Sequence, residues 1–273
     1  MRDEGKNVST SQICRWFDVP RSTFYYEPKI NEPRAPKLDE ALVEMIRGII
    51  EEEPEFGVRR ITAVLRNQLM MKVNRKKVRR IIRENGWQVR KKPQGKRPRA
   101  KGLRSVATRP NERWAIDCTS VFCGRNGWCF LMAIIDCCDR MIVGWRLSKR
   151  GVSKIAAAAL EDALRARGIK PGEVQLTIRS DNGLVFGAKP FVRVVNQFKL
   201  SQEYITPYCP EQNGMIERWF RSLKEECIWL HRFEDRDQAF AIIADWIDRY
   251  HTKRPHSALG YKTPAQFTME LAA

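Results

Sequence analysis

The sequence predicts an α/β fold in which a mixed sheet is flanked by helices and preceded by small all-α, helix-turn-helix segments. Two observations carry this prediction. Residues 1–90 hold short amphipathic helical patterns separated by turn residues. From about residue 111, β-rich runs alternate with helical patterns, which is typical of a sheet with helices packed on it.

The chain is strongly basic, and its charge is concentrated in the first half. Residues 1–108 contain 26 Lys and Arg against 13 Asp and Glu, so they hold +13 of the net charge of +18. Residues 72–104 alone have 15 basic residues and one acid, Glu84. Such a balance predicts a polyanionic partner, usually nucleic acid, because each neutralised phosphate releases counterions. A charge that only aids solubility is the alternative, and the clustering weighs against it.

Location and cysteine usage follow from what the sequence lacks. It has no run of about 18 apolar residues, so we expect no membrane span. Its first residues have no apolar signal core, so a cytosolic, reducing location is expected and the eight cysteines are interpreted as thiols. A zinc site is the alternative, but these residues match no standard spacing: Cys209, Cys227, His231, His251 and His256.

Residues 1–36 are expected to form an N-terminal helical segment and a linker. Residues 8–26 predict two short helices around a turn at 18–20, a weak helix-turn-helix signal. The linker is marked by three prolines, Pro28, Pro33 and Pro36.

Residues 37–90 are expected to form a helix-turn-helix-like DNA-binding domain. Periodic apolar residues predict helices over residues 38–53 and from about Arg59, and a third from an N-cap at Asn74 to a stop at Gly86. The second helix is expected to carry the apolar residues Ile61, Val64, Leu65 and Leu69.

The third helix has an apolar stripe and a basic surface. The stripe consists of Val78, Ile81 and Ile82. The candidate DNA-binding residues are its cations, Arg75, Lys76, Arg79, Arg80 and Arg83. A short basic helix after a tight turn suits the major groove of DNA, and a solvated helix in a small bundle is the alternative. Residues 91–110 are expected to be a basic, extended linker that follows the phosphate backbone.

Residues 111–273 are expected to form a catalytic domain with a C-terminal helical tail. Strand-like segments at 113–119, 128–136 and 140–147 predict an antiparallel meander. The elements expected next are a helix at 153–167 with Ser153 as N-cap, a strand at 174–179, a helix at 190–198, a strand at 202–206 and an amphipathic helix near 238–250.

Three acidic residues in this half are candidates for chemistry. Asp117 lies inside an otherwise apolar strand, and Asp181 ends a strand just before Asn182 and Gly183. Each carboxylate has a plainer interpretation as a turn hydrogen-bond acceptor. Catalytic groups nevertheless collect where strands end, and clustered carboxylates are the ligands that two-metal phosphoryl transfer requires.

Glu217 enters a helix beside a buried stripe. The stripe is expected to consist of Ile216, Phe220, Leu223, Cys227 and Leu230. Arg221 and Lys224 lie on the same line as Glu217, so these cations are candidates for gripping the DNA backbone. A surface ion pair between Glu217 and Arg221 is the alternative.

Together these residues resemble the Asp-Asp-Glu transposase and retroviral integrase superfamily, which has a ribonuclease-H-like fold. The interval between Asp181 and Glu217 is 35 residues, and Lys224 follows the glutamate by seven, as in that superfamily. The matching words are Trp114-x-x-Asp117-x-Thr119, Ser180-Asp181-Asn182-Gly183, and Pro210-x-Gln212-Asn213-Gly214-x-x-Glu217-Arg218.

More narrowly, residues 38–267 resemble the downstream-frame product (OrfB) of bacterial insertion sequences of the IS-three family. Two further words carry this likeness, Phe56-Gly57-Val58-Arg59-Arg60-Ile61 and His256-Ser257-Ala258-Leu259-Gly260-Tyr261-x-Thr263-Pro264. The resemblance implies a bacterial cytoplasmic transposase that frees a 3′-hydroxyl at a transposon end and joins it to another phosphodiester, without a covalent protein–DNA intermediate.

The resemblance also implies cofactors and partners. Two Mg²⁺ or Mn²⁺ ions per active site would be held by Asp117, Asp181 and Glu217. The partners would be DNA, further copies of this chain assembled on DNA, and the upstream-frame product (OrfA). Two other functions stay open on the sequence alone: a metal-dependent nuclease of the same fold that does not join strands, and a non-enzymatic DNA-binding regulator.

Overall fold

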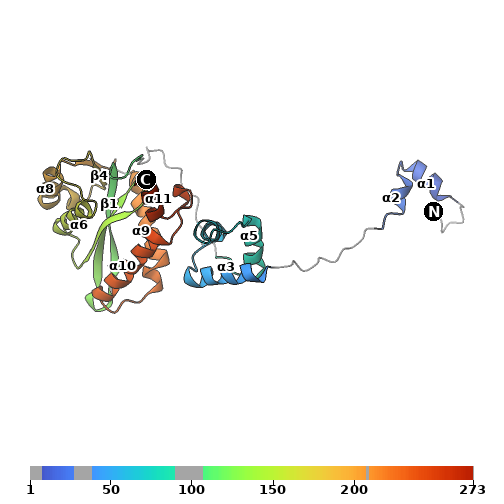
Figure 1. The fold of residues 1–273 in the computed structure, drawn as a ribbon, viewed down its shortest axis with the longest axis horizontal. Coiled ribbons are helices and arrows are strands. Elements are labelled where there is room, and N and C mark those ends of the chain that lie inside the picture. The colour runs from blue at the N-terminus through green and yellow to red at the C-terminus, as the bar shows by residue number, and fades with distance from the viewer. Residues whose placement is uncertain (1–7, 28–38, 90–106, 207–208, 273) are drawn as a thin grey trace. The chain divides into compact units, whose positions relative to one another are not determined.

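The computed structural model describes residues 8–27, 39–89, 107–206 and 209–272. The chain divides into two units, Met1–Ala41 and Leu42–Ala273 (Figure 1). Most of the basic linker expected at 91–110, and the linker of Pro28, Pro33 and Pro36, lie outside the described residues. None of the described helices is long and apolar enough to cross a membrane.

The first unit contains the two short helices that the sequence predicts. Helix α1 (Thr10–Trp16) begins with Ser9, whose side chain caps the amide of Gln12. Helix α2 (Arg21–Phe24) follows a turn in which Asp18 has a φ of 49°. Asp is one of the few residues that tolerate this left-handed conformation, so it suits this tight turn.

Three further helices follow along the chain. These are α3 (Glu40–Glu52), α4 (Val58–Ala63), which continues as a π-helical turn over Val64–Gln68, and α5 (Arg75–Glu84). Asn74 caps α5 by accepting a hydrogen bond from the amide of Lys76 at 2.8 Å, as predicted. Gly86 follows the helix with a φ of 69°, which favours glycine.

These helices share one small core. Its fully buried members include Ile46, Ile61, Leu65, Val78 and Ile81. Leu69, from the same expected helix, is 49% exposed. It follows the π-helical turn, whose extra residue per turn rotates later side chains away from the α-helical stripe.

The larger part of the second unit is built on a mixed five-stranded sheet. Its strands are β1 (Arg113–Phe122), β2 (Trp128–Asp136), β3 (Ile142–Ser148), β4 (Thr177–Ser180) and β5 (Ser201–Tyr204). The spatial order is β3-β2-β1-β4-β5. The first three strands form the predicted antiparallel meander, and β4 and β5 extend it in parallel. The predicted ribonuclease-H-like sheet flanked by helices is therefore confirmed.

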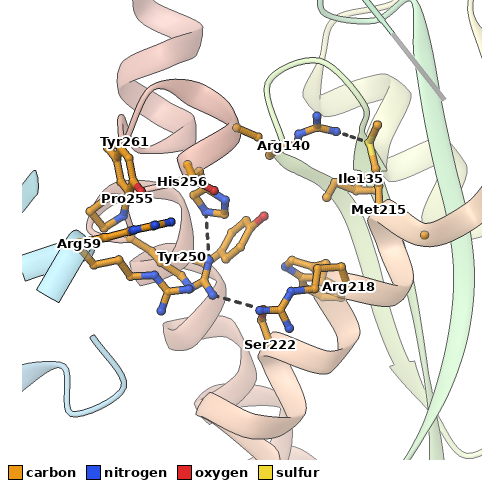
Figure 2. Close-up of a pocket in the computed structure, with 16 residues that line it drawn as sticks. Arg59, Ile135, Arg140, Met215, Arg218, Ser222, Tyr250, Pro255, His256 and Tyr261 are labelled. Atoms are coloured by element: carbon orange, nitrogen blue, oxygen red, sulfur yellow. Dashed lines mark hydrogen bonds between the residues drawn. The ribbon is translucent and has the colours of Figure 1, made fainter. Parts of the chain in front are cut away.

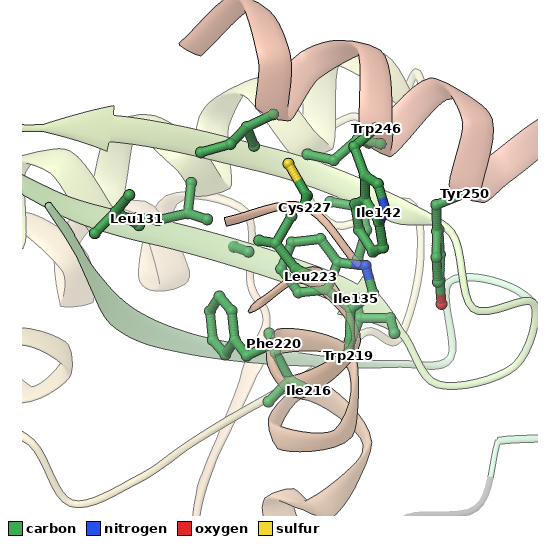
Figure 3. Packing of buried hydrophobic residues seen from close by; sticks show 14 of the residues in the cluster. Leu131, Ile135, Ile142, Ile216, Trp219, Phe220, Leu223, Cys227, Trp246 and Tyr250 are labelled. Atoms are coloured by element: carbon green, nitrogen blue, oxygen red, sulfur yellow. The ribbon is translucent and has the colours of Figure 1, made fainter. Parts of the chain in front are cut away.

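Helices cover both faces of the sheet. Helices α6 (Ser153–Ala166), α7 (Leu184–Gly187) and α8 (Lys189–Gln197) pack on one face around a core that includes Trp114 and Ile116. Helices α9 (Gly214–Glu226) and α10 (Arg236–Thr252) share the other core, which includes Ala115 (Figure 3). The chain ends with α11 (Pro264–Ala272).

Alternation along β1 explains this division. Trp114 and Ile116 point to the α6 face, whereas Ala115 and Val121 point to the α9 face. Asp117 has the same parity as Ala115, so its side chain lies on the α9 face. The central strand therefore directs its one carboxylate toward the helix that carries Glu217.

Two predictions at helix ends are wrong. Ser153 is not the N-cap of α6: that position is Val152, and the Ser153 hydroxyl instead accepts a hydrogen bond from the Phe191 amide at 3.2 Å. The buried stripe of α9 ends before Leu230, which is 60% exposed. The helix stops at Glu226, so Leu230 no longer follows its periodicity.

Candidate active site

Parallel pairing of β1 and β4 brings the two aspartates level. The register pairs Ala115 with Arg179, and continuing it by two residues sets Asp181 opposite Asp117. Neighbouring strands lie roughly 5 Å apart, and residues in register point to the same face. The two carboxylates are therefore neighbours on the α9 face, at the end of the short strand β4.

The pKa of Asp117 reports this crowding. It is raised to about 6, mainly because the carboxyl is buried and secondarily because Asp181 and Glu217 are negatively charged. A hydrogen bond from the Cys118 amide to Asp117 Oδ1 (2.7 Å) and the charge of Lys224 oppose the rise. All three candidate carboxylates, together with Lys224, thus lie within electrostatic reach of one another.

Asp181 is held by the turn that follows it. Its Oδ1 accepts a hydrogen bond from the Gly183 amide at 2.9 Å. A Cβ atom on Gly183 would lie only 2.8 Å from the same oxygen, so a side chain at position 183 would displace the Asp181 carboxylate. Asn182 donates to the carbonyl of Ile205 at 2.9 Å and ties the turn to the segment after β5.

Glu217 lies in the first turn of α9, where a negative charge interacts favourably with the helix dipole. Its side chain is exposed, whereas Ile216 and Phe220 are buried. Arg221 forms its ion pair with Glu225, with 3.0 Å between Nε and Oε1. Arg221 thus pairs with the glutamate four residues after it. The alternative expected from the sequence was a pair with Glu217, four residues before it.

The start of α9 is fastened to the strand that carries Asp117. Asn213 is 3% exposed, and its side-chain amide donates to the carbonyl of Ile116 at 3.3 Å. Gln212 forms two hydrogen bonds with Thr206, at 2.8 and 3.0 Å, which close the loop before the helix. The sequence words include these amides but do not reveal that they position the site. Two neighbouring amides in a short polar loop before the helix that carries Glu217 are the available signal.

Trp114 in the first sequence word is also structural. It is fully buried, and its indole N–H donates to the carboxylate of Asp136 at 3.1 Å. Arg179 lies on β4, two residues before Asp181. It donates to the carbonyl of Gln212 at 2.8 Å and forms an ion pair with Glu203 on β5 at 2.8 Å. These contacts hold the strands and the loop in place on both sides of the aspartates.

The three carboxylates do not surround a common point. Among the described residues, no group of three His, Cys, Asp or Glu side chains could hold a metal ion as the side chains stand. The donor chemistry nevertheless fits a hard divalent cation, because all three ligands are carboxylates. Within the same residues, the second oxygen of Asp117 and of Asp181 accepts no recorded hydrogen bond.

Cys118 is next to the site but unsuited to act as a nucleophile. Its pKa is raised to about 11, first by burial and then by the charges of Asp117 and Asp181. The neutral thiol dominates under such conditions, and only the thiolate is strongly nucleophilic. All eight cysteines are free thiols in the structure.

The basic residues predicted for DNA contact lie on the exposed surface of α5. The side chains of Arg75, Lys76, Arg79, Arg80 and Arg83 are all exposed. The apolar stripe opposite them, Val78, Ile81 and Ile82, is buried as predicted. The helix therefore has one face in its domain and one basic face outside it.

Three protein-family models match the chain. Two are described as integrase core domain and match residues 107–210 and 199–264. The third is described as an HTH-like domain and matches residues 37–95. Together these matches cover helices α3 to α5, the five-stranded sheet and helices α6 to α10.

Similar proteins come from bacterial insertion elements. An uncharacterized 31.7 kDa protein of insertion element IS407 from Burkholderia multivorans is 29% identical, over 97% of this chain and 92% of its own length. Transposase InsD of insertion element IS2 from Escherichia coli is 28% identical, over 83% of this chain and 78% of its own. Among solved structures, the catalytic core domain of BIV integrase has a TM-score of 0.44 and 18% identity, over 59% of this chain and 95% of that one.

Proposed function

Since this chain belongs to the insertion-sequence transposases that carry an integrase core domain, consistent with an OrfB-type product of the IS-three family, we propose that it cuts and joins DNA at Asp117, Asp181 and Glu217. The observation that carries the assignment is the parallel register of β1 and β4, which sets Asp181 opposite Asp117. The raised pKa of Asp117 supports it, because the charges of Asp181 and Glu217 are two of its causes after burial. Carboxylates that far apart in sequence gather at the cost of mutual repulsion, and a catalytic site is where such a cost is expected.

The enzyme is a polynucleotidyl transferase of the Asp-Asp-Glu type. In the first step, water forms a bond to phosphorus at a transposon end, and the 3′-oxygen leaves as a hydroxyl. In the second step, that 3′-oxygen forms a bond to a phosphorus of target DNA, and the target's own 3′-oxygen leaves. Each step exchanges one P–O bond for another, so no external energy source is needed.

We propose that Asp117, Asp181 and Glu217 hold divalent cations, Mg²⁺ or Mn²⁺, two per site. When bound, such ions activate the attacking oxygen and stabilise the leaving one. The chain's own contribution is to fix the donors. The Cys118 and Gly183 amides each donate to one oxygen of an aspartate, which leaves the other oxygen of each as a possible metal ligand. The third donor is the exposed side chain of Glu217.

The site assignment is tested by three isosteric substitutions, Asp117→Asn, Asp181→Asn and Glu217→Gln. The full chain is incubated with Mg²⁺ and labelled DNA ends of the element, and both cleaved and joined products are measured. We expect each variant to lose both products while it still binds the DNA in EDTA. Glu161→Gln on α6 serves as the matched control and is expected to keep full activity. Near wild-type activity in any one variant would remove that residue from the site.

The same assay separates the transposase from a nuclease of the same fold. Wild-type protein is expected to yield joined strands as well as cleaved ends. Cleavage without any joined product, at DNA concentrations where both ends are bound, would favour the nuclease.

We propose that the exposed cations of α5 contact DNA, as do Arg221 and Lys224 on α9. The test is Arg79→Ala combined with Arg80→Ala, measured as the slope of log affinity against log salt concentration. Each lost phosphate contact lowers that slope by about 0.9, so the pair is expected to lower it by up to about 2. An unchanged slope would mean that this face of α5 stays in solvent.

The domain division 1–36, 37–90, 91–110 and 111–273 is retained as a proposal. The same applies to assembly of several copies on DNA, to a partnership with the upstream-frame product (OrfA), and to the bacterial cytoplasm as location. Size-exclusion chromatography with light scattering, with and without DNA, tests the assembly. A single copy per DNA end under catalytic conditions would contradict it.

A further inference from the structure

A basic cavity lies beside α9 (Figure 2). Its volume is about 470 Å³, within the range of pockets that hold small ligands. Met215, Arg218 and Ser222 line it, and at 100° per residue they occupy another side of the helix from Glu217, Arg221 and Lys224. The cavity is therefore separated from the three carboxylates by the body of α9.

Five arginines surround this cavity, from four separate segments of the second unit. They are Arg59, Arg60, Arg140, Arg218 and Arg254. Tyr250, Tyr261 and His256 provide aromatic walls between them. In Figure 2 the Arg140 and Arg218 side chains lie on the α9 side, and those of Arg59 and Tyr261 lie across from them.

The positive charge is only partly compensated. Among the described residues, Glu226 is the carboxylate that pairs with this group: it binds Arg254 at 2.6 and 2.8 Å and lies 3.5 Å from Arg60. No ion pair with a described carboxylate is recorded for Arg59, Arg140 or Arg218. Arg140 instead points its guanidinium at the sulfur of Met215, a weak acceptor.

The titration of neighbouring groups reflects the same excess of cations. Burial and then the charges of Arg254, Arg60 and Arg140 lower the pKa of His256 to about 2. The pKa of Arg60 is also lowered, by burial and by the charge of Arg254 before other effects. Cations held this close together with one partner carboxylate are stabilised when an anion enters.

We propose that this cavity binds a phosphate of a DNA strand, distinct from the phosphate that reacts at the carboxylates. The guanidinium fork matches phosphate oxygens and allows two hydrogen bonds from one side chain. Because the two sites lie on different sides of α9, the bound phosphate belongs to another nucleotide than the reacting one. The identity of the strand as transposon or target DNA rests on the proposed function, but the affinity for phosphate does not.

The test pairs a charge-removing double variant with single neutral phosphates in the DNA. Arg140→Gln with Arg218→Gln removes both charges and leaves a polar amide at each position, and neither arginine has a described carboxylate partner that would be left unpaired. Arg165→Gln with Arg193→Gln, exposed on α6 and α8, removes the same charge elsewhere. Binding of the full chain to a labelled duplex of the element's end is measured in EDTA. One methylphosphonate is introduced at each backbone position in turn.

We expect wild-type protein and the control variant to lose about tenfold in affinity when the methylphosphonate occupies one particular position. The cavity variant should bind less tightly to unmodified DNA, with a salt slope lower by about 1, and should be indifferent to the modification at that position. Equal sensitivity of both double variants at every position would overturn the proposal. A second arm adds inorganic phosphate or dAMP as competitor. Micromolar binding of either one that depends on Arg140 and Arg218, with no variant-specific position in the DNA, would assign the cavity to a free anion and equally overturn it.

These measurements are made without divalent cations, so they do not depend on catalysis. Suppose that Asp117→Asn loses activity but the cavity variant shows the same sensitivity to each methylphosphonate as wild type. The active-site assignment would then stand, and only the cavity proposal would be removed. The reverse result would keep the cavity and remove the active-site assignment. Melting temperatures of both double variants show whether the fold is intact.

Discussion

Replacing Asp117 by Asn is expected to stabilise the metal-free protein while it removes catalysis. The folded state raises the pKa of this carboxyl from 3.8 to about 6, by burial first and by Asp181 and Glu217 next. A group whose pKa is higher in the folded state stabilises the fold while it is protonated, and that contribution is lost as pH rises through about 6. At pH 7.5 the ionised carboxylate therefore costs about 3 kcal/mol, at about 1.4 kcal/mol per pKa unit.

Asparagine avoids this cost and keeps the local geometry. Its side-chain oxygen can still accept the hydrogen bond that the Cys118 amide donates to Asp117 Oδ1 at 2.7 Å. The gain at pH 7.5 should approach 3 kcal/mol as an upper limit, and it should shrink to about 1 kcal/mol at pH 4.5, where the wild-type carboxyl is protonated in the folded state.

The assay is urea unfolding of the full chain in EDTA at both pH values. Asp237→Asn on α10 is the control, because its carboxylate is exposed, with 83% of the side chain accessible, and it should give no gain. Adding Mg²⁺ at pH 7.5 should then reduce the difference in the free energy of unfolding between Asp117→Asn and wild type. A ligand that binds only the folded wild type stabilises it by mass action. If the asparagine variant is no more stable than wild type at pH 7.5, or equally stabilised at both pH values, the electrostatic account of this site is wrong.

Three further substitutions probe the supports of the site. Gly183→Ala should push the Asp181 carboxylate aside, because the new Cβ would meet its oxygen at 2.8 Å; we expect strand cleavage to fall at least about tenfold with little change in melting temperature, and unimpaired cleavage would contradict this. Asn213→Ala should slow cleavage while DNA binding persists, because the start of α9 loses its tie to β1; equal losses of both in a filter-binding assay would instead indicate unfolding. Arg167→Met should cost about 3–5 kcal/mol in urea unfolding, because the fully buried Asp139 loses its partner at 2.7 Å, and a loss below 1 kcal/mol would show that its other hydrogen bonds suffice.

Local patterns predict most of the fold because each element carries its own periodicity. The apolar run at 128–136 coincides with β2, and Asn74 and Gly86 bound α5 as their capping chemistry requires. The alternation along β1 also decides which face each residue takes, including Asp117. Such features depend on neighbours within a few residues, which is the range that a sequence displays directly.

Features that depend on distant partners were not predictable in the same way. Serine is a residue type favoured at N-caps, yet the hydroxyl of Ser153 accepts a hydrogen bond from the amide of Phe191, which is 38 residues away. Arg221 has a glutamate four residues away on either side, and the sequence gives no reason to choose Glu225 over Glu217. The cavity arginines are dispersed from Arg59 to Arg254, so the clustering appears only when the chain is folded.

The candidate site combines both kinds of information, and this explains why its spacing is informative. The two aspartates become neighbours through the parallel register of β1 and β4, and a parallel pair requires a crossover between the strands. The 35 residues after Asp181 then contain α7, α8 and β5 before the chain returns to α9. That segment must pass to the sheet edge at β5 and back over the other face, where Asn213 attaches it to β1 beside Asp117. An interval much shorter than this would leave Glu217 unable to reach the aspartates, so the spacing in the sequence measures a path through the fold.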